Sequence, residues 1–98
     1  MNIEKEYAGN VTTLKISGRL DTTTAPALEA TVSEVIGNCE QLILDFASLE
    51  YISSAGLRVL LKAQKSMAKK GGMKLLNVNE TIMEIFEITG FCDILTIE

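Results

Sequence analysis

The segment Leu42–Met67 constrains the fold more than any other part of the chain, because a strand pattern changes there to a helix pattern. It opens with a short apolar run between polar neighbours, which predicts a buried strand over Leu42–Phe46. Apolar residues then recur at the spacing of one helical face, at Leu57, Leu60, Leu61 and Met67. We therefore expect a strand, a polar loop and a helix over about Ser54–Lys69.

Two adjacent serines stand where this helix is expected to begin. Serine is a preferred N-cap because its side-chain oxygen accepts a hydrogen bond from a free backbone N–H of the first turn, and a simple cap is the commonest role of such a residue. Here Ser53 and Ser54 are both present, and Ala55 and Gly56 leave the first turn almost without side chains. The turn is therefore also a place that another molecule, or an anion attracted by the helix dipole, can approach closely.

The N-terminal part of the chain predicts a hairpin followed by a helix. Loose alternation over Ile3–Ala8, the turn signal Gly9-Asn10 and β-branched alternation over Val11–Ile16 indicate two paired strands. Pro26 suits the first turn of the next helix, since its missing N–H has no partner there, and Gly37-Asn38 ends that helix.

The C-terminal part adds a strand over Met73–Val78, a helix between a cap at Asn79 and Gly90, and a last strand over Ile94–Ile97. After the opening hairpin, helices thus alternate with apolar strands. This order predicts an α/β fold: a mixed β-sheet of four to five strands, with parallel crossovers on the later strands and helices packed against it. Sites in such sheets lie at the carboxyl ends of the strands, where we expect Asp21 and Ser54 to share one edge.

Length and charge limit the class of protein. The chain has 98 residues, which predicts one domain over residues 1–98. Its formal net charge of −4 argues against binding to nucleic acid or to an anionic membrane surface. The charged N-terminus has no signal-peptide pattern, and no apolar run approaches the roughly 18 residues of a membrane span, so we expect a cytoplasmic protein without direct membrane contact. Cys39 and Cys92 are expected to be small apolar residues in or near the core.

Catalytic chemistry has little support in these residues. A serine nucleophile needs a nearby base, usually histidine, and the chain has no histidine; Lys62 and Lys65 occupy positions typical of surface charge. No glycine-rich phosphate-binding motif occurs. The acidic residues Asp21, Asp45 and Glu50 fit ordinary turn or surface roles better than a magnesium site. We therefore expect a binding module that is not an enzyme and needs no metal and no cofactor.

The passage Asp45–Leu57 resembles the signature of STAS-domain proteins of the anti-sigma factor antagonist family. That signature is a strand ending in Asp, a short loop, and Asp-Ser-Ser/Thr/Ala-Gly-Leu at the start of a helix. The passage Gly18–Pro26 resembles the family's segment before the first helix, and the similarity covers nearly the whole chain. The resemblance implies a single STAS-like domain whose phosphorylated serine matches Ser54. The Asp that usually precedes it is Ser53 here, so Ser53 is the second candidate.

The resemblance implies a switch. The unphosphorylated protein would bind an anti-sigma factor serine kinase and so release a sigma factor; phosphorylation of Ser54 would break the complex, and a serine phosphatase would reset it. We also expect a monomer. The alternative is a STAS subunit of a membrane transport system, which acts as an interaction module without phosphorylation. The predicted partner-binding residues are Asp21, Thr22, Ser53, Ser54, Ala55, Gly56, Leu57 and Arg58.

Overall fold

A five-stranded sheet with the strand order β1-β2-β3-β4-β5 is the frame of the protein, in a computed structural model that describes residues 1–98. The strands are β1 (Asn2–Ala8), β2 (Val11–Leu20), β3 (Gln41–Ile52), β4 (Met73–Leu76) and β5 (Thr96–Ile97). β1 runs antiparallel to β2, and every later neighbour pair is parallel. The α/β class and the mixed sheet predicted from the sequence are therefore confirmed.

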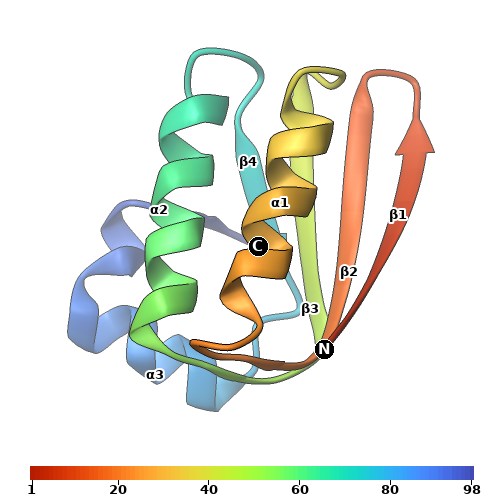
Figure 1. Cartoon of the computed structure of the whole chain (residues 1–98). Coiled ribbons are helices and arrows are strands. Elements are labelled where there is room, and N and C mark those ends of the chain that lie inside the picture. Colours follow the sequence, from red (N-terminus) through yellow and green to blue (C-terminus); the bar gives the residue numbers. More distant parts are fainter.

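The connections between the parallel strands are helical. They are α1 (Ala25–Ile36), α2 (Ser54–Met67) and α3 (Glu80–Thr89), the last followed by the 3-10 turn η1 (Phe91–Asp93). α1 and α2 lie side by side across one face of the sheet, and α3 lies near the end at which both of them begin (Figure 1). None of these helices combines the length and the hydropathy that a membrane-spanning helix needs.

The core fills the space between the sheet and these helices. Its largest fully buried side chains include Leu14 and Leu44 from the sheet and Leu28 and Leu60 from α1 and α2. The crossovers thus bury the apolar faces that the sequence pattern predicts. Both cysteines are free; Cys39 is buried in the core, and Cys92 is half-buried against it.

β3 is longer than the sequence predicts. The expected strand ended at Phe46 and was followed by a loop, whereas β3 continues to Ile52. Its pairing with β2 shifts register twice, and each time β3 carries one extra residue, as in a β-bulge. The bulges bring Phe46, Leu49 and Ile52 all to the core side, at a spacing of three. Strict alternation, which identifies a half-buried strand in a sequence, is lost there.

Other boundaries differ by a few residues. β2 extends beyond Ile16 to Leu20 because it pairs with the bulged part of β3. β4 stops before Asn77, whose φ of 58° lies in the left-handed region. α2 ends two residues before the predicted Lys69, and η1 shortens the last strand. The predicted caps of α3 are confirmed: the Asn79 side chain accepts a hydrogen bond from Ile82 N, and Gly90 is left-handed with φ 80°.

The first turn of α2 packs closely against β2 and β3. A Cβ atom at Gly56 would lie 2.7 Å from Leu20 Cγ and 2.8 Å from Ile52 Cγ1. The sequence predicts that Ala55 and Gly56 leave this turn open to another molecule. For Gly56 that expectation is wrong, because the space beside it is filled by the protein's own core.

We expect Gly56→Ala to lower the free energy of unfolding by about 1–3 kcal/mol, because the new methyl group overpacks the contact with Leu20 and Ile52. This range is the net loss after the better helix propensity of Ala, about 1 kcal/mol, has been subtracted. Urea unfolding measures the difference. Gly37→Ala is the matched control, since Gly37 has φ −68° and nothing within 4 Å of an added Cβ atom. Equal stability of the Gly56 variant and the parent would show that the turn is looser than described.

Candidate functional site

The carboxyl ends of β2 and β3 meet at one edge of the sheet. The backbone N–H of Ser53 donates a hydrogen bond to the carbonyl oxygen of Leu20, with an N···O distance of 2.8 Å. Asp21 follows Leu20, and Ser54 follows Ser53, so this single bond joins the start of the loop before α1 to the start of α2. Asp21 and Ser54 therefore share one edge, as the sequence predicts.

The two serines have different surroundings. Ser53 occupies the N-cap position of α2 in extended backbone conformation, but its side chain makes no capping hydrogen bond. Its Oγ atom is buried and has no hydrogen-bond partner. The expected cap bond is therefore absent, since the Ser53 hydroxyl faces inward. Ser54 is the first residue of α2 and is exposed, so of the pair it is Ser54 that offers its side chain to solvent.

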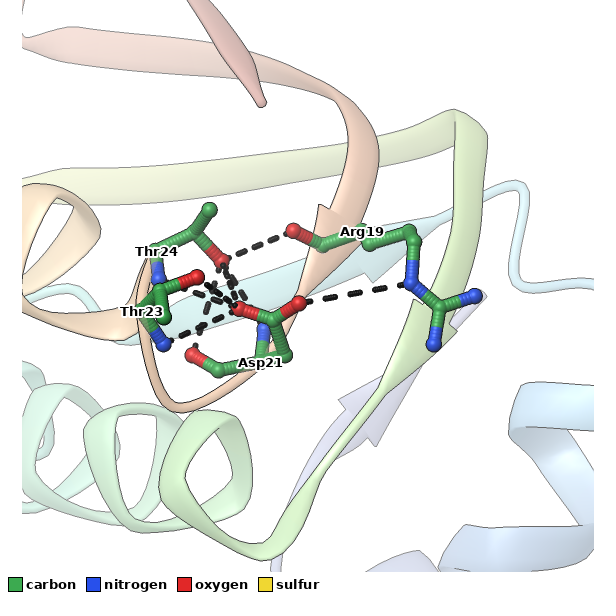
Figure 2. Close-up of polar contacts among 4 residues, drawn as sticks. All are labelled: Arg19, Asp21, Thr23 and Thr24. Carbon is green, nitrogen blue, oxygen red and sulfur yellow. Dashed lines mark hydrogen bonds and ion pairs between the residues drawn. The ribbon is translucent and has the colours of Figure 1, made fainter.

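The loop before α1 is organised around the carboxylate of Asp21 (Figure 2). Its Oδ1 atom accepts hydrogen bonds from the Thr23 hydroxyl at 2.7 Å, the Thr23 N–H at 3.0 Å and the Thr24 N–H at 3.2 Å. The Thr24 hydroxyl in turn donates to the Arg19 carbonyl and accepts from the Asp21 N–H, both at 2.8 Å. The loop thus satisfies its own polar groups and leaves Thr22 exposed at its tip.

These contacts set the charge state of Asp21. The hydrogen bond from the Thr23 hydroxyl, helped by the N–H groups of Thr24 and Thr23, lowers the pKa of the Asp21 carboxyl below its usual value, although partial burial opposes the shift. Arg19 lies on the other side, with its Nε atom 4.0 Å from Asp21 Oδ2 and its guanidinium carbon 4.5 Å from the centre of the Tyr51 ring. The aromatic face holds this cation beside the loop.

A shallow depression of about 260 Å³ lies between the first turns of α1 and α2. Thr22, Ala55 and Arg58 line it, so three of the predicted partner-binding residues border one hollow. Gly56 and Leu57 are buried, and they position the turn rather than cover its surface. Their contact with a partner stays a prediction.

The remaining acidic candidates lie in other places. Asp45 lies at the first bulge of β3, where its Oδ1 atom accepts hydrogen bonds from Ala47 N and Asn77 Nδ2 at 3.0 and 2.9 Å. Glu50 is exposed on the last part of β3. A larger hollow of about 340 Å³ on the sheet is lined by Asp45 and other residues of β1 to β3, and it contains one of the sequence candidates, whereas the depression between the helices contains Thr22, Ala55 and Arg58. The site at the helix starts is therefore the one that unites the sequence candidates.

Sequence reasoning missed Thr23, Thr24, Arg19 and Tyr51 as parts of the site. A signal for the first two exists, because Asp followed by Thr residues before a helix is typical of a side-chain-stabilised turn. The stacking of Arg19 on Tyr51 had no such signal. The two residues pair across β2 and β3 only because of the second bulge.

Known proteins of one family match this chain over its length. The STAS domain family matches residues 2–98. An anti-sigma F factor antagonist of Paenibacillus polymyxa is 30% identical over 100 residues, which cover 99% of this chain and 86% of the relative. An anti-sigma-B factor antagonist of Bacillus subtilis is 30% identical over 98 residues, which cover 99% of this chain and 90% of the relative.

Solved structures share the fold. An anti-sigma factor antagonist from Mycobacterium paratuberculosis has a TM-score of 0.90 at 24% identity, with 98% of this chain and 83% of that one covered. The Bacillus cell fate determinant SpoIIAA in its phosphorylated form has a TM-score of 0.77 at 21% identity, with 99% and 91% covered. A sulfate transporter family protein from Wolinella succinogenes has a TM-score of 0.75 at 21% identity. The match covers 91% of this chain and 74% of that one.

The structural neighbours, all below 25% identity, define a STAS-type fold. The chain belongs to the STAS domain family, and its near full-length matches at 30% identity put it among the anti-sigma factor antagonists of that family.

We expect Asp21→Asn to lower the free energy of unfolding at neutral pH, because an amide oxygen is a weaker acceptor than a carboxylate for the groups of Thr23 and Thr24. The folded-state pKa of Asp21 lies below its unfolded value of about 3.9, so its stabilising effect is present above that value. The effect is lost as the pH falls through the folded-state pKa. Urea unfolding over a series of pH values down to about 2 measures the change.

The control for this experiment is Glu84→Gln, which alters an exposed acid on α3 that makes no ion pair. The difference in the free energy of unfolding between Asp21→Asn and the parent should become smaller as the pH falls. If this difference in the free energy of unfolding stays constant with pH, the charge of Asp21 does not stabilise the loop.

Proposed function

We propose that this protein is an anti-sigma factor antagonist that binds an anti-sigma factor serine kinase in its unphosphorylated form and so releases a sigma factor. Phosphorylation of Ser54 switches it off, and a serine phosphatase resets it. The chain itself is the ligand and substrate, and the chemistry belongs to its partners. The proposal implies action in the cytoplasm, together with the ATP that the kinase uses.

The observation that carries the proposal is the difference between the two serines. Ser54 is exposed at the first position of a 14-residue helix, whereas the Ser53 hydroxyl is buried. A kinase needs a hydroxyl that can reach the terminal phosphate of its ATP. The surroundings of Ser54 meet this need, and its position matches the serine of the family signature. The phosphorylated form of SpoIIAA, a protein with the same fold, is further support.

The phosphoryl transfer adds charge without disturbing the fold. Ser54 Oγ would attack the γ-phosphorus of ATP, the bond from that phosphorus to the bridging oxygen would break, ADP would leave, and the hydroxyl proton would pass to a base of the kinase. The new group carries about −1.5 to −2 charges at neutral pH. It would sit at the positive end of the α2 dipole, where free backbone N–H groups stabilise an anion.

The surface next to Ser54 explains how such a charge acts as a switch. Thr22 and Ala55 are small and uncharged, and the depression between the helices is also lined by Arg58 and by the ion pair of Glu29 and Lys62. A partner that docks over these residues comes close to Ser54. A phosphate in that contact would be stripped of water and would repel any acidic group opposite it. A loss of about 2.7 kcal/mol already weakens binding about a hundredfold.

We expect Ser54→Ala to bind the kinase but to resist phosphorylation, and Ser54→Asp to fold yet bind at least about a hundredfold more weakly. Affinity capture from the source cell's lysate, with the intact mass of the recovered protein, tests both variants. Calorimetry with the purified partner then gives the dissociation constants. Ser53→Ala is the matched control and should still be modified.

Three outcomes would contradict the proposal or part of it. A phosphate mapped to Ser53 alone would keep the switch and move its site. Unchanged binding by Ser54→Asp would remove the electrostatic explanation. Capture of transporter components, with no phosphate under any growth condition, would support the alternative role as a subunit of a membrane transport system.

A further inference from the structure

Arg58 lies one helical turn after Ser54 on the exposed side of α2. The two residues are at positions i and i+4, which are neighbours on a helix surface. Long side chains in a helix lean toward its N-terminus and cover the preceding turn. The guanidinium of Arg58 can therefore reach back over the turn that carries Ser54.

Arg58 has no partner within the protein. None of the five ion pairs involves it, and its side chain makes no hydrogen bond. Lys62, the next cation on the same side of α2, forms an ion pair with Glu29, with 2.8 Å between Lys62 Nζ and Glu29 Oε1. Arg19 stacks on the ring of Tyr51. Arg58 also lines the depression of about 260 Å³ together with Thr22, Ala55 and the paired Glu29 and Lys62. It is thus a free cation beside the proposed site of modification.

We propose that Arg58 is the internal ligand of the phosphate on Ser54, and that its guanidinium closes over this group in the phosphorylated protein. The inference rests on the proposed function, since it assumes that Ser54 is the residue modified. A guanidinium presents its N–H groups as a planar fork that matches two phosphate oxygens. The backbone N–H groups at the start of α2 would contact the phosphate from the other side.

The contact would give phosphorylation a second effect. In the unphosphorylated protein Arg58 borders the depression and is available to an acidic group of a partner. In the phosphorylated protein the phosphate would hold Arg58 instead. The surface would then gain an anion and lose a free cation in one step, and both changes disfavour the same partner.

The test uses the full chain with phosphoserine incorporated at position 54 during translation, so that no kinase is needed. Phosphorus NMR then measures the second pKa of the phosphate. A nearby cation favours the dianion and lowers this pKa. We expect Arg58→Gln to raise the second pKa of the phosphate by about half a unit, which corresponds to the strength of an exposed ion pair. Arg58→Lys, which keeps the charge and loses the fork, should give a smaller rise.

Lys65→Gln is the matched control, because it removes the same charge from the last turn of α2. Lys65 lies 11 residues after Ser54, about 16 Å along the helix and beyond the screening length at moderate salt. We expect no change in the phosphate pKa for this variant. Equal values for Arg58→Gln and the parent, or an equal rise for Lys65→Gln, would overturn the inference.

The experiment also separates this inference from the proposed function. Because the phosphoserine is introduced by translation, the titration reports the Arg58 contact whether or not a cellular kinase modifies Ser54. A protein that is never phosphorylated in the cell would defeat the proposed function, even if the titration shows the expected rise. An unchanged pKa in a protein that is phosphorylated in the cell would defeat only the role of Arg58.

Discussion

The hydrogen bond from the Ser53 N–H to the Leu20 carbonyl is the contact on which the site depends. It joins two chain segments that leave neighbouring parallel strands, and the close packing of Gly56 on Leu20 reinforces it. A side chain at position 56 would overlap Leu20 and Ile52, so the packing between the first turn of α2 and the sheet would have to shift. The surface is thus built by backbone contacts, and its side chains are carried on a rigid frame.

The frame leaves few groups free to respond to a partner. The polar groups of the loop before α1 are satisfied by Asp21 and Thr24, and Arg19 is held against Tyr51. Among the groups at the surface without a partner are the Ser54 hydroxyl and the cation of Arg58. Glu29 and Lys62 beside them form an ion pair and offset each other's charge, so one added phosphate changes the net charge of this surface strongly. This sensitivity is what the proposed switch requires.

Much of the fold and part of the site could be predicted from the sequence, for local reasons. The helices are marked by apolar periodicity and by end signals such as Asn79 and Gly90, which act through short-range hydrogen bonds and backbone angles. The order of strands and helices then requires parallel crossovers, and these bring Asp21 and Ser54 to one edge. The prediction failed over the second half of β3, because the two bulges that bring Leu49 and Ile52 to the core arise from pairing with β2.

The sequence by itself determined the class of fold, the start of α2 and the pair of serines as the place of interest, since each depends on residues close together in the chain. The tertiary structure decided which serine faces solvent, why Gly56 is needed, and which cations are free. These properties depend on contacts between residues far apart in sequence, such as those of Ser53 with Leu20 and Lys62 with Glu29. A local pattern contains no information about such pairs, so only the packed sheet and helices reveal that Ser54 and Arg58 remain without partners.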